Sequence, residues 1–148
     1  MAVITTNTSG TQPVITINTE VSGPLVIPYI QDITITNSTG VYAYTNFTDA
    51  DKRKLSTPAD NEVSTNVVID DAAFFGGSGT AGSASALGLL ALSINKTPIT
   101  FSIEWNGAGG AHTSTGSGFI TSIAAKTSPE APVWVTPLNI AVDGAFSD

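Results

Sequence analysis

The chain has 148 residues, of which 41% are hydrophobic and 11% charged. Five Lys and Arg residues against twelve Asp and Glu give a net charge of −7, which disfavours binding to DNA phosphates or to an anionic membrane surface. The absence of cysteine excludes disulfides and thiolate metal sites. We therefore expect a single domain over residues 1–148, whose neutral polar surface suits contacts between protein chains.

The first half of the chain contains patterns that are typical of antiparallel strands. Short β-branched or alternating apolar runs predict strands at residues 14–17, 33–36, 41–47 and 63–69. Asn37–Gly40 is expected to form a hairpin turn between the second and third of these strands. Residues 1–12 are polar and are expected to form a flexible N-terminal arm. They lack the features of a signal peptide, and no apolar run approaches the ~20 residues that span a bilayer, so no membrane anchor is expected.

Residues 48–62 carry a concentration of charge and are expected to form an exposed loop. The charged residues are Asp49, Asp51, Lys52, Arg53, Lys54, Asp60 and Glu62. The acidic pair Asp49 and Asp51 resembles the start of a calcium loop, but the three cations that follow argue against a cation site. The basic run has two interpretations: solvated loop charge, or a patch that docks on an acidic face of another copy and contributes register more than affinity.

One helix is predicted at residues 84–95. The apolar positions Leu87, Leu90, Ala91 and Ile94 have the spacing of a single helix face. Ser83 or Ser85 can cap the start of this helix, and Pro98 follows its end. The sequence therefore indicates one helix among strands.

The second half of the chain returns to strand patterns. Ile99–Trp105 alternates apolar and polar residues, a Gly/Ser/Thr run follows to residue 118, and further strands are expected at residues 119–125 and 133–142. The apolar phase changes at Pro137, whose missing N–H indicates a bulge or an edge position. We therefore predict a mainly β fold, an antiparallel β-sandwich or small barrel with one flanking helix.

No pattern in the sequence predicts catalysis. Residues 77–82 match a dinucleotide-binding fingerprint, but that fingerprint needs a βαβ unit in a parallel sheet. His112 is the single histidine, whereas metal sites and catalytic triads need several partners. Trp105 and Trp134 would suit sugar stacking if both were exposed, although core or interface packing is commoner for Trp. We therefore expect no enzyme activity, no catalytic residue, no cofactor and no metal.

The order of elements in the second half resembles that of the major tail tube proteins of long-tailed bacteriophages. The resemblance rests on the helix at 84–95, the strand Ile99–Trp105, the Gly-rich turn, and the run Gly118–Ile123. A Ser/Pro/Glu connector, Ser128–Glu130, and the terminal strand from Leu138 to Gly144 complete it. It extends over roughly residues 41–144 as a pattern of elements rather than as a signature motif.

The resemblance implies a structural virion protein of the phage tail, made in the host bacterial cytoplasm. Subunits of this family form hexameric rings that stack into a tube around the tape-measure protein, between tail terminator and tail-tip proteins. DNA later passes through the tube without specific binding. A long loop commonly reaches the neighbouring ring, and residues 48–62 are best placed for that inter-ring contact. The alternatives are another head, neck, tail or decoration protein of a phage, and a carbohydrate-binding β-sandwich.

Overall fold

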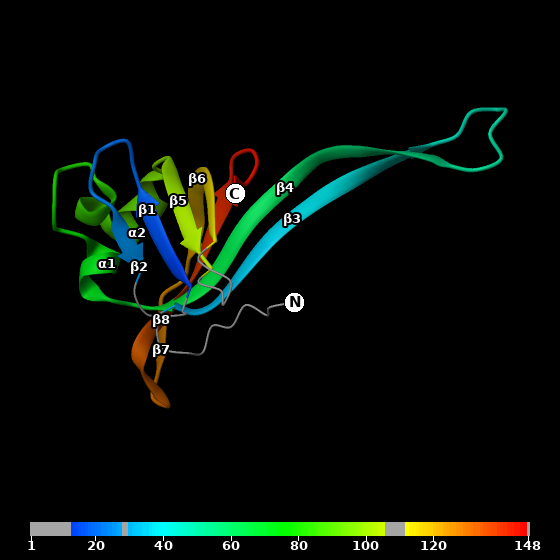
Figure 1. The fold of residues 1–148 in the computed structure, drawn as a ribbon. Helices are drawn as coiled ribbons and strands as arrows, with labels where there is room; N and C mark the ends of the chain where they lie inside the picture. Colours follow the sequence, from blue (N-terminus) through cyan, green and yellow to red (C-terminus); the bar gives the residue numbers. More distant parts are fainter. Residues whose placement is uncertain (1–12, 28–29, 106–111, 148) are drawn as a thin grey trace.

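A computed structural model describes residues 13–27, 30–105 and 112–147 (Figure 1). The expected flexible arm at residues 1–12 lies outside the described residues, as do residues 106–111 of the Gly-rich run. In chain order the elements are β1 (Val14–Asn18), β2 (Leu25–Ile27), β3 (Ile30–Tyr44), β4 (Arg53–Val68), α1 (Asp71–Phe75), α2 (Ala84–Asn95), β5 (Ile99–Glu104), β6 (Thr113–Ile123), β7 (Lys126–Ser128) and β8 (Ala131–Val142).

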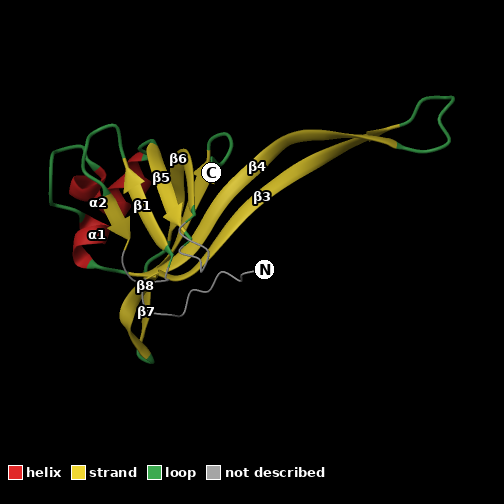
Figure 2. Cartoon of the chain, in the orientation of Figure 1, coloured by secondary structure: helices red, strands yellow, loops and turns green. Residues whose placement is uncertain are grey.

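The described strands form one antiparallel sheet. Its order is β2-β1-β5-β6-β8-β4-β3, and β7 pairs with β8 beside this path. The sheet curls around its core, and the two helices lie at the side of β1 and β2 (Figure 2). The predicted mainly β, antiparallel architecture is confirmed, with one short helix, α1, that the sequence analysis did not predict.

The core follows from the two-residue period of the strands. On β1, Ile15 and Ile17 are fully buried, and on β8 Leu138 and Ile140 are fully buried. These side chains alternate with less buried neighbours, because successive residues of a strand point to opposite faces. Leu89 and Leu92 of α2 belong to the same hydrophobic cluster, so the helix closes one side of the core.

The hairpin β3–β4 is much longer than the sequence patterns predicted. The turn expected at Asn37–Gly40 is wrong, because these residues are part of β3 and lie opposite residues of β4. The loop expected at 48–62 is also wrong from residue 53 onward, because β4 begins at Arg53. Turn-forming residues are tolerated in this strand since most of it is exposed to solvent on both faces, and no packing constraint selects β-branched residues there.

Helix α2 has the predicted bounds but not the predicted buried face. Ser83 is the N-cap, and its Oγ accepts a hydrogen bond from Ala86 N at 3.3 Å. Gly88 interrupts the helix with φ 75° and ψ 168°. This break shifts the helical phase, so that Leu92 is buried and Ile94, expected on the core face, is 69% exposed.

Pro137 lies where β8 changes its neighbour on one edge. On the β4 side, Pro137 stays in register opposite Asn66. On the other side, pairing with β6 ends at Leu138, and pairing with β7 begins at Val135. The register shift itself is in β6, between Ile120 and Ser122. The expected bulge is therefore in the neighbouring strand, and the missing N–H of Pro137 falls in the gap between two partners.

Candidate assembly surfaces

The outer part of the β3–β4 hairpin, residues 38–60, forms a projecting arm, called here the hairpin arm. β4 pairs with β8 from Asn61 to Val68, whereas Arg53 to Asp60 pair with β3 alone within the described part of the chain. In Figure 1 this two-stranded ribbon extends far beyond the body of the molecule. Because an isolated two-stranded ribbon is at best marginally stable in water, the arm is a surface that gains stability from a partner.

Apolar side chains are exposed on the outer half of the hairpin arm. Tyr42 lies opposite Leu55, and directly opposed residues of a sheet point to the same face. Tyr42 and Leu55 are 62% and 55% exposed. The rings of Tyr42 and Tyr44 stack with centroids 6.3 Å apart. Phe47, in the tip, is fully exposed, so the outer arm presents an aromatic and aliphatic surface to solvent.

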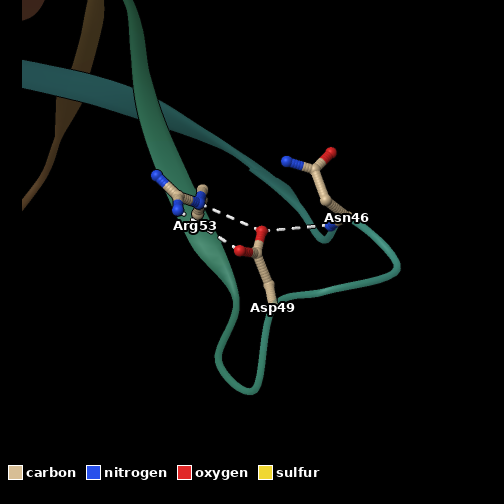
Figure 3. Close-up of polar contacts among 3 residues, drawn as sticks. All are labelled: Asn46, Asp49 and Arg53. Carbon is tan, nitrogen blue, oxygen red and sulfur yellow. Dashed lines mark hydrogen bonds and ion pairs between the residues drawn. The ribbon is translucent and has the colours of Figure 1, made fainter.

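The tip of the hairpin arm is held by one carboxylate (Figure 3). Asp49 Oδ2 accepts hydrogen bonds from Arg53 Nε at 3.0 Å and from Asn46 N at 3.1 Å, and Asp49 Oδ1 accepts one from Arg53 Nη2 at 3.2 Å. The Arg53 guanidinium, followed by the Asn46 amide, lowers the pKa of Asp49 below its usual value. These bonds close the turn between β3 and β4.

The other charged residues of the predicted contact loop are distributed along the arm. Asp51, Lys52 and Lys54 are exposed near the tip, together with the Asp49–Arg53 pair. Asp60 and Glu62 lie farther down β4, close to the body. The structure therefore brings residues 49–54 together and separates Asp60 and Glu62 from them.

Asn61 anchors the base of the hairpin arm, and sequence reasoning missed it. Its side chain is 3% exposed. Its Nδ2 donates to the Gly144 carbonyl oxygen at 2.7 Å, and its Oδ1 accepts from Asn37 Nδ2. The side chain thereby connects β3, β4 and the segment after β8. The available signal was the alternation of Asn61, Val63, Thr65 and Val67, which extends the buried face one position toward the charged residues.

Where β3, β4 and β8 pair, the face of the sheet that points away from the core carries mostly short polar side chains. Thr34 lies opposite Ser64, and Ser64 lies opposite Asn139. Asp32 accepts hydrogen bonds from Asn66 through both carboxylate oxygens. The charged members of this face are two carboxylates; its residues are Asp32, Thr34, Thr36, Glu62, Ser64, Asn66, Asn139 and Ala141.

Two strands at the ends of the sheet have an unpaired edge within the described residues. These are β2 at one end of the strand order and β3 at the other. An unpaired edge offers a row of backbone donors and acceptors that another strand can pair with. The edges of β2 and β3 therefore have backbone groups with which a further strand could pair.

A second projection is the β7–β8 hairpin, residues 126–135, which extends downward in Figure 1. Val133 and Trp134 are 48% and 54% exposed. Lys126 pairs with Val135, so the hairpin continues β8 past the point where β4 ends. It is a smaller apolar surface than the hairpin arm.

The segments that carry candidate chemical motifs do not form a reactive site within the described residues. Residues 77–82 connect two helices beside a sheet whose described strands pair antiparallel, so the βαβ context of a dinucleotide fingerprint is not present there. His112 is exposed, and its carbonyl oxygen accepts from Trp105 N. Across the described ranges, no three His, Cys, Asp or Glu side chains are grouped as metal ligands.

The two tryptophans are not equivalent. Trp105 is half-buried, and its Nε1 donates to Ser114 Oγ at 2.9 Å, whereas Trp134 is exposed. The exposed pair that sugar stacking would require is therefore not formed by these residues. Among the helices of the described residues, none is long and apolar enough to cross a membrane.

The architecture is that of tail tube proteins. A chain from the tail of an empty gene transfer agent particle, refined with C6 symmetry, matches with a TM-score of 0.64 and 17% identity over 90% of this chain and 93% of that chain. A chain from the virion of a native gene transfer agent particle matches with a TM-score of 0.66 and 16% identity, over 95% and 97% of the two chains.

A chain of the SPP1 tail tube is similar as well, with a TM-score of 0.65 and 11% identity over 93% of this chain and 77% of that chain. No protein-family model matches the sequence, and no curated protein matches it. Identities this low show a common fold. The resemblance found in the sequence is thus confirmed at the level of the fold, the tail tube fold.

Proposed function

We propose that this protein is the tube subunit of a phage-type tail. The observation that carries this proposal is the tail tube fold over at least nine-tenths of the chain, combined with an arm that has no partner of its own in the described residues. The protein would act as a structural component of the virion tail, made in the host bacterial cytoplasm, and would work through assembly rather than catalysis.

Ring formation is proposed to use the edges of the sheet. Pairing β2 of one copy with part of β3 of the next would satisfy the unpaired backbone groups of β2 and of the paired part of β3, and would continue the sheet around a closed ring. The C6 symmetry of the similar gene transfer agent tail favours rings of six.

Stacking of rings is proposed to use the hairpin arm. The arm projects beyond the body, and its tip residues Asp49, Asp51, Lys52, Arg53 and Lys54 would contact a copy in the neighbouring ring. Asp60 and Glu62, nearer the body, would lie at the start of this contact. The stacked rings would enclose the tape-measure protein and end at terminator and tip proteins.

The polar outer face of β3, β4 and β8 is proposed as the wall of the bore. Its short side chains and its two carboxylates, Asp32 and Glu62, would give DNA no cationic side chain to bind on this face. Like charges would repel the DNA backbone, so that DNA passes without being retained.

Electron microscopy of the purified full-length protein over a concentration series tests the proposal. We expect hollow rings or tubes of uniform bore at high concentration. A protein that remains monomeric at every concentration, also when tape-measure and tip proteins are added, would contradict the proposed tube subunit. That result would favour a decoration or neck protein instead.

The absence of native cysteine allows a direct test of the bore wall. In assembled tubes, Cys at position 64 (S64C) should react with a small maleimide and resist a maleimide attached to a large polymer. The exposed position Asn95 at the end of α2 provides the control, N95C. Equal protection of both positions, or free reaction of S64C with the bulky reagent, would refute the assigned wall.

A further inference from the structure

The hairpin arm and the β7–β8 hairpin leave the sheet at opposite ends of the same strands. β4 and β8 are paired from Asn61–Val142 to Val68–Val135. Beyond the first pair, β4 continues alone with β3 into the arm, whereas beyond the second pair β8 continues with β7 into the other hairpin. The molecule thus has an arm end and a hairpin end, separated along one strand direction.

Both ends expose apolar side chains of similar kind. The arm end presents Tyr42, Phe47 and Leu55, and the hairpin end presents Val133 and Trp134. Aromatic and aliphatic residues that project from a soluble body in this way mark surfaces that are covered in an assembly. Contact between the two ends would bury the exposed apolar side chains of both.

The two ends differ in charge. In the arm, Lys52, Arg53 and Lys54 balance Asp49, Asp51 and Asp60, so the whole net charge of −7 lies outside it. At the outermost part of the arm, the exposed charged residues are Asp51, Lys52, Arg53 and Lys54, whereas the Asp49 side chain is 12% exposed and bonded to Arg53. Outside the proposed bore wall, the hairpin end carries three carboxylates and Lys126; the carboxylates are Asp70 and Asp71 after β4 and Glu130 in the β7–β8 turn.

We infer that the hairpin arm of one copy docks on the hairpin end of a second copy of this chain. The contact rests on the proposed tail tube function and specifies where the arm binds. The contact joins two different surfaces, the arm of one copy and the hairpin end of another, so it is heterologous. Repetition of the same contact from copy to copy builds an open assembly instead of a closed dimer. Apolar burial supplies the affinity, and the charge difference selects this pairing over arm against arm.

Cross-linking with engineered cysteines tests the contact, because the chain has none of its own. The double variant T48C/T127C places one cysteine at the arm tip and one on β7, both exposed, and keeps all the apolar anchors. With a flexible bismaleimide, we expect a ladder of covalent oligomers in denaturing gels. The matched control T48C/N95C, with its second cysteine at the exposed end of α2, should give no ladder.

The outcomes separate this inference from the function on which it rests. Tubes that form without a T48C/T127C ladder, or equal ladders from both double variants, overturn the docking site and leave the tube intact. A T48C/T127C ladder without tubes supports the docking site and contradicts the tube. A sample with neither overturns both.

A second variant measures the apolar part of the contact. Y42S/L55S should raise the protein concentration at which tubes elongate by about tenfold or more, because central apolar anchors dominate interface energies. This increase should persist in high salt. The control S56A, on the same stretch of β4, should leave the concentration unchanged. An unchanged value for Y42S/L55S would overturn the role of this face.

Discussion

Asn61 links a projecting element to the body of the molecule through one neutral side chain. It is buried at the point where the hairpin arm leaves the body, and it bonds to Asn37 on β3 and to the Gly144 carbonyl oxygen after β8. A buried polar group that loses its partner costs more free energy than the hydrogen bond itself contributes. The arm is therefore tied to the body through polar bonds at its base.

Replacement of Asn61 by alanine should lower the free energy of unfolding by about 1–2 kcal/mol, because its buried side chain makes two hydrogen bonds, to Gly144 O and from Asn37 Nδ2, that are both lost. Urea denaturation measures this change. The matched control is N66A, whose exposed side chain bonds to Asp32 and whose loss should cost less than about 1 kcal/mol. Equal effects of the two substitutions would argue against a special role for Asn61.

Asp49 provides a test of the tip geometry. Because Arg53 lowers the pKa of Asp49 in the folded chain, the carboxylate contributes stability above its unfolded pKa and loses this contribution as the pH falls through the lower folded pKa. We expect carboxyl NMR to show Asp49 titrating below the usual range of an aspartic acid. In R53Q the pKa of Asp49 should move upward, and an unchanged pKa would mean that the pair is not formed in solution.

At the scale of elements, Gly88 decides how α2 packs. Its φ of 75° breaks the helix, and a Cβ at this position would meet Gly76 N at 2.5 Å and Phe74 O at 2.6 Å. The close approach of α1 and α2 thus depends on the missing side chain. The same break moves Leu92 to the core and Ile94 to the surface.

The substitution G88A should destabilise the fold by more than about 3 kcal/mol, since backbone strain and a clash with backbone atoms act together. The control G77A also has a positive φ, of 106°, but its added Cβ would meet nothing within 4 Å. We expect G77A to cost about 1–2 kcal/mol, the strain alone. Thermal unfolding of both variants measures the difference, and equal melting temperatures would show that α1 and α2 separate without cost.

Much of this architecture was predictable from local patterns. The bounds of α2 and the strands β1, β5 and β8 follow from apolar periodicity and capping residues, because each buries one face against the core. The hairpin arm was not predictable in this way. Its residues are exposed on both faces, so burial imposes no alternation, and Asn37–Gly40 has the composition of a turn while it forms part of a strand.

The candidate assembly surfaces were predictable from the sequence only in part. The tip charges at residues 49–54 were identified from composition, whereas Asn61 and the apolar pair Tyr42 and Leu55 were not. The burial of Asn61 and the exposure of Tyr42 and Leu55 depend on how β3, β4 and β8 pair, and on where β8 ends. Strand pairing and the end of β8 are long-range properties, and the alternation of residues within one strand does not reveal them.

For the whole molecule, charge reversal of the tip tests assembly without disturbing the fold. The triple variant K52E/R53E/K54E should keep the melting temperature of the monomer within a few degrees, because these side chains are exposed. It should raise the concentration needed for tube elongation by about tenfold at low salt, and less at high salt. Light scattering with electron microscopy measures both effects.

A compensating change provides the control for that variant. Reversal of the exposed acidic residues at the hairpin end, D71K/E130K, should restore elongation of the reversed tip by returning attraction to the contact. Tubes that form normally in the triple variant alone would show that Lys52, Arg53 and Lys54 are ordinary solvated charge.

The unlike ends of the β3–β4–β8 sheet have a consequence for the finished particle. A tube built from arm-to-hairpin contacts is directional: one mouth presents a ring of unoccupied arms, and the other presents a ring of unoccupied, acidic hairpin ends. Proteins that stop growth at the two mouths would then need opposite recognition chemistry, one imitating the acidic hairpin end and the other imitating the apolar arm with its three tip cations. The subunit itself would determine which way round the tail is attached.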